Sequence, residues 1–158
     1  MLSMLCVCTA EMAVLKMIRT YSELIKRDTF LDRYRYLRLG GKIGEETFGF
    51  DRYLNQQFYK SQEWLSVRDH VIIRDTGNNE YCQDLGADGY DIRGRIIVHH
   101  MNPLTMEDLI RKTKYLLDPE YLICTIKNTH DAIHYGDESL LITAPTVRTK
   151  YDTCPWRR

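Results

Sequence analysis

The chain has 158 residues, enough for one domain with a closed core and little room for a second. Its 44% apolar and 28% charged residues are typical of a globular protein and exclude a disordered or fibrous one. The 22 Lys and Arg residues balance the 22 Asp and Glu residues. This balance excludes a uniformly basic DNA-coating protein, so any nucleic-acid contact must come from local patches.

The five cysteines are scattered and form no C-x-x-C pair, which argues against a disulfide scaffold and a four-cysteine zinc site. A reducing cytoplasm is therefore the expected compartment. No apolar run approaches the roughly 18 residues of a membrane span, so we expect no membrane partner. Residues 1–16 are apolar without the basic start of a signal peptide, and Met17 opens a more polar sequence. We interpret residues 1–16 as a mis-assigned start or a loosely attached helix, with a native extension as the open alternative.

The first half of the chain is predicted to be helical. Apolar residues near helical spacing over 20–39 predict two short helices, the second capped by Asp28 or Thr29 and stopped by Gly40-Gly41. After a glycine-rich link, residues 61–75 predict one amphipathic helix that buries Trp64 and ends at the glycine of Gly77-Asn78-Asn79.

The second half mixes strands and helices. Beta-branched residues predict a strand over 92–99, and an apolar run predicts another over 122–125. Thr105 and Asp108 have the spacing of a capping box, which predicts a helix from there to about Tyr115. A last short helix over 130–135 is expected to be capped by Asn128-Thr129 and to end at Gly136.

Four of the five histidines lie between positions 99 and 134. His99 and His100 end a predicted strand, where successive side chains point to opposite faces, so one can face a metal and the other a substrate. His130 and His134 are four residues apart on a predicted helix, so both imidazoles project from one face. Taken separately, each pair is more often a set of ordinary polar residues. Their joint order favours a metal site.

In this order, IIVHHMNP followed by LDPEYLICTIKNTHDAIHYG resembles the HNH nuclease family, whose core is a ββα-metal finger. The preceding FYKSQEWLSVRDHVIIRD and the tail are similar to small HNH-type proteins of phages that infect Gram-positive bacteria. The resemblance implies an α+β fold in which N-terminal helices pack around the finger. It divides the chain into a helical region (17–60), the finger domain (61–143) and an irregular basic tail (144–158).

The resemblance implies a role for each histidine. His99, His130 and His134 match the three metal ligands, and His100 matches the general base. Tyr121 falls where the family has an Asn that braces the base, which is a departure from its pattern. The expected cofactor is one divalent ion: magnesium, manganese, nickel or zinc. Asp131 or Asp137 is a candidate to orient a ligating imidazole, although solvated acids are the plainer interpretation.

The resemblance implies a metal-dependent endonuclease that hydrolyses phosphodiester bonds of duplex DNA in a bacterial host cell. The phage packaging terminase is a further partner that it suggests. Arg93 and Arg95 flank the first strand and are the expected DNA-backbone contacts, whereas Trp64 and Trp156 are expected to be packing residues. The alternative is a catalytically weak accessory protein that keeps the metal-stabilised finger to bind DNA or protein. Tyr121 and the balanced charge favour this alternative, and the four histidines favour the nuclease.

Overall fold

The computed structural model describes residues 17–39 and 52–141. The predictions for residues 1–16, for Gly40-Gly41, for the tail 144–158 and for Trp156 therefore lie outside the described residues. In chain order the elements are α1 (Tyr21–Leu24), α2 (Phe30–Leu37), α3 (Arg52–Lys60), α4 (Gln62–Thr76), β1 (Ile97–His100), α5 (Met106–Arg111), α6 (Lys114–Leu117), β2 (Leu122–Thr125) and α7 (Lys127–Tyr135). This mixture of helices with a small sheet confirms the α+β class.

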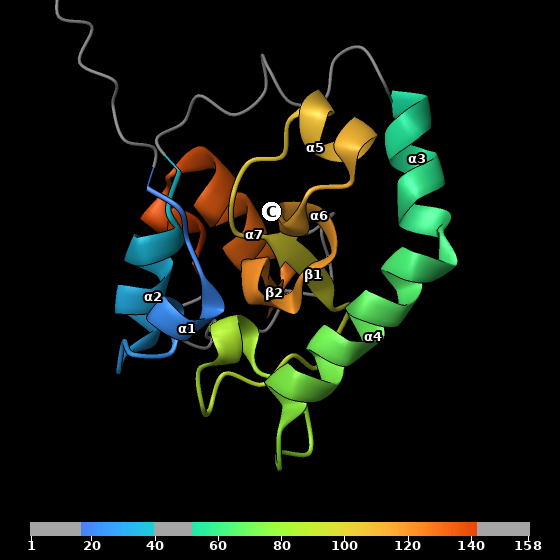
Figure 1. Cartoon of the computed structure of the whole chain (residues 1–158). Helices are drawn as coiled ribbons and strands as arrows, with labels where there is room; N and C mark the ends of the chain where they lie inside the picture. Colours follow the sequence, from blue (N-terminus) through green and yellow to red (C-terminus); the bar gives the residue numbers. More distant parts are fainter. Residues whose placement is uncertain (1–16, 40–51, 142–158) are drawn as a thin grey trace, which may run out of the picture.

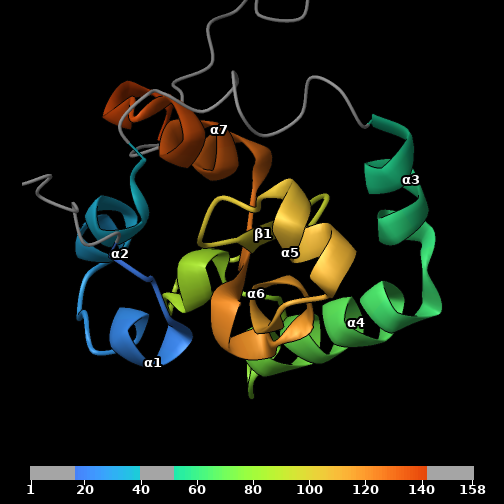
Figure 2. The same cartoon turned by 45° about the horizontal axis from the view of Figure 1, so that its top comes forward.

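Strands β1 and β2 form an antiparallel pair in the middle of the molecule (Figure 1). The register places Val98 opposite Cys124 and His99 opposite Ile123. Helices α1, α2 and α7 lie on one side of this pair, and α3 and α4 lie on the other side (Figure 2). The two strands are therefore enclosed between two helical layers.

The predicted helix starts are confirmed by hydrogen bonds at the caps. The Thr29 hydroxyl accepts from the backbone N–H of Asp32, and the Ser61 hydroxyl accepts from that of Trp64. Thr105 and Asp108 form the expected capping box at the start of α5. These short polar side chains satisfy backbone donors that the first helical turn leaves open, so the local sequence suffices to place each start.

Three boundaries differ from the predictions. The first strand begins at Ile97 instead of Ile92, because Asp91 and Ile92 pair with Gln83 and Cys82 of the preceding loop. The helix after Thr105 breaks at Lys112, whose φ of 48° is left-handed, and resumes as α6. Helix α7 starts at Lys127 instead of His130. The residue before it, Ile126, has no side chain that can cap the helix.

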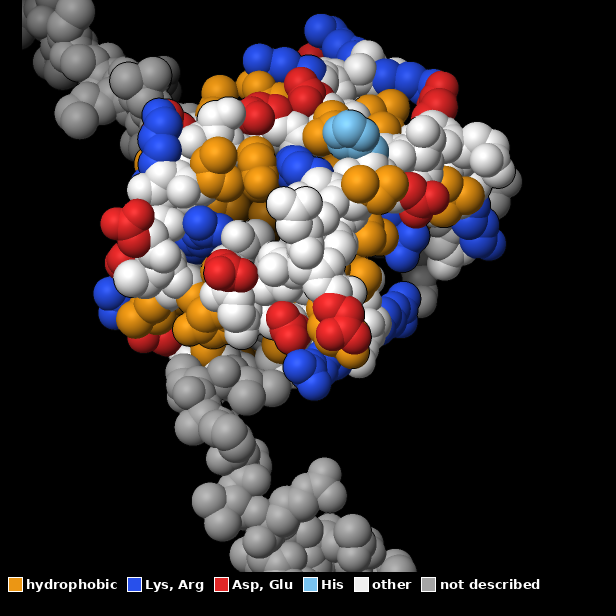
Figure 3. All heavy atoms as spheres, turned by 90° about the horizontal axis from the view of Figure 1, so that it is seen from below, with side chains coloured by type: hydrophobic (Ala, Val, Ile, Leu, Met, Phe, Trp, Pro, Cys, Tyr) orange, Lys and Arg blue, Asp and Glu red, His pale blue; other side chains and the backbone are white. Residues whose placement is uncertain are grey.

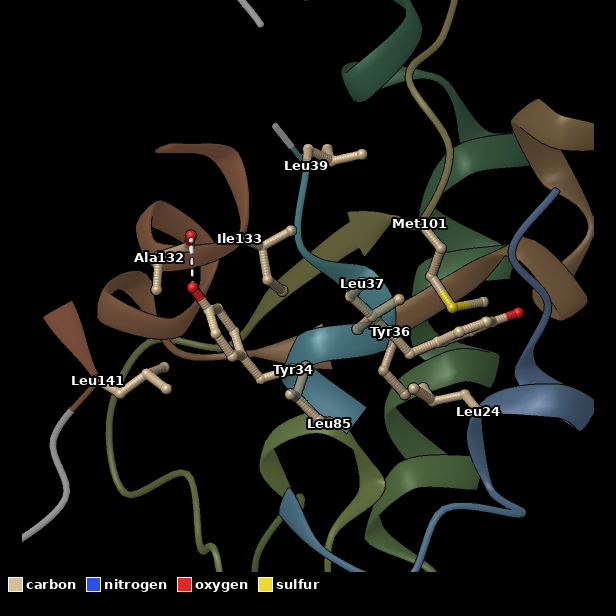
Figure 4. Close-up of a cluster of buried hydrophobic side chains, with 11 residues drawn as sticks. Leu24, Tyr34, Tyr36, Leu37, Leu39, Leu85, Met101, Ala132, Ile133 and Leu141 are labelled. Carbon is tan, nitrogen blue, oxygen red and sulfur yellow. Dashed lines mark hydrogen bonds between the residues drawn. The ribbon is translucent and has the colours of Figure 1, made fainter. Parts of the chain in front are cut away.

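One hydrophobic cluster joins the N-terminal helices to the sheet and to α7 (Figure 4). Leu24, Tyr34 and Leu37 are fully buried in it with Ile123 and Ile133. The Tyr34 hydroxyl also donates to the Ala132 carbonyl at 3.4 Å. Helices α1 and α2 thus form one body with the region around α7.

A second cluster lies between the sheet and α4. Trp64 and Val71 of α4 pack there with Leu122 and Cys124 of β2. Because residues of β2 alternate between the two clusters, each face of the strand pair is covered by apolar side chains. Among the described residues, no helix is long and apolar enough to cross a membrane.

Two isoleucines on helices provide a matched test of the packing. Ile133 is fully buried on α7, whereas Ile73 on α4 is 72% exposed. We expect Ile133→Ala to lower the free energy of unfolding by about 2–5 kcal/mol, because it leaves a cavity between α7 and α2. Ile73→Ala should lower it by less than about 1 kcal/mol. Urea unfolding measures both values, and equal losses would contradict the packing described.

Candidate metal centre

Strand β1 sends its two adjacent histidines to opposite faces of the sheet. His99 lies opposite Ile123, which belongs to the cluster beneath α7. His100 lies opposite Leu122, which belongs to the cluster beneath α4. The alternation expected at the end of this strand is therefore present, and only His99 faces α7.

His99, His130 and His134 converge at one point between β1 and α7. One ring nitrogen from each lies within 4.8 Å of the other two. The His99 ring is nearly perpendicular to both others, at centroid distances of 5.1 Å from His130 and 4.9 Å from His134. The three predicted ligands thus come together from two elements, with the i, i+4 spacing on α7 placing two of them side by side.

The hydrogen bonds of this cluster indicate which nitrogens are free to bind. His130 Nδ1 lies 3.3 Å from a carboxylate oxygen of Asp131, which can only accept, so the proton of His130 is on Nδ1. Nε2 of His130 therefore carries a lone pair, and it lies 3.1 Å from Nε2 of His134. Of the two candidate acids, Asp131 contacts one of these imidazoles, and its carboxylate also pairs with Lys127. Asp137 instead accepts from the backbone and hydroxyl of Ser139.

Nε2 of His99 is a buried nitrogen without a hydrogen-bond partner among the described residues. Leaving such a group unpaired costs about 1–3 kcal/mol. A metal ion would give this nitrogen the partner that it lacks. Tetrahedral zinc–nitrogen bonds of about 2.0–2.1 Å place two ligand nitrogens about 3.3 Å apart, close to the 3.1 Å between His130 and His134. The residues present therefore fit a divalent ion that accepts three imidazoles.

Burial favours the neutral form of His99 and of His134, and a neutral imidazole is the form that binds metal. Burial lowers the pKa of His99 well below its usual value, with smaller contributions from His134 and His130. Burial likewise lowers the pKa of His134 to about 4, with His130 as the next cause. Three neutral imidazoles with an adjacent carboxylate suit zinc, nickel and similar borderline ions.

A buried carboxylate from a distant loop fixes the start of α7. Asp84 accepts a 2.6 Å hydrogen bond from the Thr129 hydroxyl and a 3.4 Å bond from the Ile126 N–H. It supplies the cap that the α7 sequence lacks, and negative charge at a helix N-terminus is stabilising. The expected cap, Asn128-Thr129, is wrong because both residues lie inside the helix and Thr129 bonds to Asp84 instead.

His100 lies outside the three-imidazole cluster. Its ring stacks on Trp64 at a centroid distance of 5.1 Å, with Phe58 and Tyr59 each 6.4 Å away. Its Nε2 lies 3.1 Å from the Leu116 carbonyl, which can only accept, so Nε2 carries the proton and Nδ1 the lone pair. Burial lowers the pKa of this half-buried imidazole to about 4.

The structure does not place Tyr121 against His100. Tyr121 is buried before β2, and its ring packs on Tyr115 at a centroid distance of 4.8 Å. The ammonium of Lys114 lies over the same ring at 5.5 Å from its centroid. Tyr121 supports the backbone instead, since its carbonyl accepts from the Met101 N–H just after β1. No hydrogen bond or ring contact among the described residues joins Tyr121 to His100, so a role for Tyr121 in bracing the base stays a prediction.

Arg93 and Arg95 are exposed residues just before β1. The guanidinium of Arg93 pairs with Asp91 at 3.0 Å and lies over the Tyr81 ring, so part of its charge is already neutralised. No ion pair among the described residues involves Arg95. On the face of the molecule in Figure 3, basic and acidic side chains of the described residues are intermixed. Contact of these two arginines with DNA stays a prediction.

Sequence reasoning missed three residues around the cluster: Asp84, Asn102 and Arg19. Asn102 follows β1 and bonds through its side chain to the backbone of Arg19, 83 positions earlier. Asp84 is 45 positions from Thr129. Neither spacing matches a helix or strand period, so no local pattern in one sequence signals these contacts.

Comparisons with known protein families, with curated proteins and with solved structures gave no match. The resemblance to HNH nucleases thus stays a prediction.

The buried carboxylate Asp84 gives a test by pH. Burial raises its pKa to about 6, so the folded state holds this proton more tightly than the unfolded state. The corresponding stability is present below pH 4 and is lost as the pH rises through 6. Asp84→Asn keeps a neutral side chain throughout. We therefore expect its free energy of unfolding, relative to wild type, to rise by about 2–3 kcal/mol between pH 4 and pH 7.

Urea unfolding at several pH values measures this difference, and Asp88→Asn in the exposed part of the same loop is the matched control. A difference that does not change with pH would show that Asp84 is not buried as described.

The ligand set gives a second test. His134→Ala should weaken zinc binding by more than the roughly 10- to 100-fold that loss of an outer hydrogen-bond partner costs. The metal-free fold should change little, because the half-buried imidazole lies on a helix surface. Calorimetric zinc titration measures the affinity, and His70→Ala on the exposed side of α4 is the matched control. Equal zinc affinity in both variants would remove His134 from the ligand set.

Proposed function

We propose that the protein is a metal-dependent endonuclease of the ββα-metal type that hydrolyses phosphodiester bonds in duplex DNA. One observation carries the proposal. Three imidazoles from β1 and α7 converge, and one of them presents a buried Nε2 that has no hydrogen-bond partner in the described part of the chain. The chain order β1, β2, α7, with α5 and α6 inserted between the two antiparallel strands, supports the assignment to the ββα-metal type.

In this function His99, His130 and His134 hold one divalent ion, with zinc or nickel favoured by three nitrogen ligands. When bound, such an ion supplies Lewis-acid stabilisation of the negative charge that develops during phosphodiester cleavage. Asp131 keeps the proton of His130 on Nδ1 and so keeps Nε2 available. Asp84 holds the helix that carries two of the ligands.

His100 is the proposed general base. The Leu116 carbonyl holds its proton on Nε2, so the lone pair of Nδ1 can accept a proton from a water molecule. The oxygen of that water forms a bond to phosphorus while the bond to the leaving oxygen of the sugar breaks. Stacking on Trp64 restricts rotation of the imidazole and so keeps Nδ1 in one direction.

The alternative function is a metal-stabilised accessory protein with weak or no nuclease activity. The enclosure of His100 by Phe58, Tyr59 and Trp64 favours it, because a base must reach the water that it activates. A groove of about 300 Å³ beside this enclosure has mainly apolar walls, including Phe58 and Leu116. Such walls suit a protein segment better than a phosphate.

Plasmid nicking with added magnesium, manganese, nickel or zinc separates the two functions. We expect His100→Ala to retain zinc binding and to lose cleavage by about 10²–10⁴-fold, the contribution of a positioned general base. His99→Ala should lose metal and cleavage together, because its Nε2 belongs to the centre.

His70→Ala, the exposed control, should cut as wild type does. If the purified protein binds zinc but cuts with none of the four metals, the accessory function is correct. If His100→Ala cuts as fast as wild type, another residue takes the proton.

A further inference from the structure

Arg19 is held beside the three-imidazole cluster by contacts with two of the segments that border it. Its backbone N–H donates to Oδ1 of Asn102 at 2.8 Å, and its carbonyl accepts from Nδ2 of Asn102 at 2.8 Å. Asn102 is three residues beyond His99 along the chain. This two-bond clamp fixes the backbone of Arg19 next to the end of β1.

The guanidinium of Arg19 is fixed from the other side by the segment that follows α2. Its Nε–H donates to the Tyr36 carbonyl at 2.9 Å, and its terminal nitrogen donates to the Arg38 carbonyl at 3.2 Å. The next residue, Leu39, donates its N–H to the carbonyl of Ile133, which lies between His130 and His134 on α7. Arg19 is therefore linked to both elements that carry the three imidazoles, to the end of β1 through Asn102 and to α7 through the segment 38–39.

A guanidinium has five N–H donors, and these two carbonyls use two of them. Among the described residues the other three donors of this half-buried cation have no partner, and its two carbonyl contacts already fix its position. A fixed planar cation next to a divalent-ion centre suits a phosphate, which guanidinium groups bind with two parallel hydrogen bonds.

We propose that Arg19 binds a non-bridging oxygen of the phosphate group that occupies the three-imidazole centre. This inference deepens the proposed function and rests on it. Arg19 belongs to the segment before α1. The proposal therefore also gives a chemical role to the N-terminal layer, which consists of this segment with α1 and α2. The competing interpretation is that Arg19 only braces the loop after α2 through its two carbonyl contacts.

Binding of inorganic phosphate to the zinc-loaded protein tests the proposal without relying on cleavage. Arg19→Gln should weaken phosphate binding by about 10- to 100-fold, the range for charge-assisted hydrogen bonds, and should leave the zinc affinity unchanged. Arg35→Gln is the control, because it removes an arginine whose ion pair with Glu138 is exposed to solvent. Calorimetry measures both ligands. Unchanged phosphate affinity in Arg19→Gln would overturn the proposal.

A measurement on the wild-type protein covers the case in which Arg19→Gln does not fold. The ¹⁵N-detected Nε–H resonance of Arg19 should shift when phosphate is added to the zinc-loaded protein. Arg35 should not respond. Absence of a shift at Arg19 would show that it only braces the loop, and the proposal would be wrong.

Plasmid cleavage then identifies the source of the phosphate. If the phosphodiester of DNA is the ligand, Arg19→Gln should lower kcat/KM for nicking together with its phosphate affinity. If free phosphate is the ligand, phosphate binding should fall while nicking is unchanged. Phosphate binding through Arg19 in a protein that cuts no DNA would remove the nuclease function and keep the Arg19 site. A protein that binds no zinc would overturn both.

Discussion

A two-stranded antiparallel ribbon is only marginally stable alone in water, so the pairing of β1 with β2 depends on the helices that cover its two faces. Helix α7 with α2 covers the face of Ile123, and α4 covers the face of Leu122. This covering fixes the register, because a slip by one residue would exchange every buried side chain for its neighbour. It also fixes which histidine faces α7. The centre can be built only while both layers are in place.

The polar contacts near the centre add what apolar packing does not supply. Packing sets the distance between α7 and the sheet, but it does not fix the residue at which α7 begins. Asp84 fixes that start by accepting hydrogen bonds from the Thr129 hydroxyl and the Ile126 N–H. Asp84 is itself costly to bury, and its pKa of about 6 is the sign of that cost. Stability is thus given up in exchange for a defined position of the ligand-bearing helix.

Features that depend on neighbouring residues could be predicted from the sequence. The Thr29 cap, the Thr105–Asp108 box and the spacing of His130 and His134 are local, and the structure contains each of them. The alternation of His99 and His100 also follows from strand geometry alone. Contacts between distant segments could not be predicted, because no period relates Asp84 to Thr129 or Asn102 to Arg19. The surroundings of His100 could not be predicted either, because Trp64, which stacks on it, belongs to the distant helix α4.

The distribution of these contacts along the chain has a consequence for how the protein folds during synthesis. The three ligands and both strands lie within residues 97–135, so this part can collapse through contacts of short range in sequence. The N-terminal layer is made first, yet its partners Asn102 and Ala132 emerge some 83 and 98 residues later. The apolar faces of helices α1 and α2 therefore stay exposed to solvent until the sheet and α7 have been synthesised and folded. We expect the layer that carries Arg19 to dock last, and the strand pair and the centre to become stable only at that step.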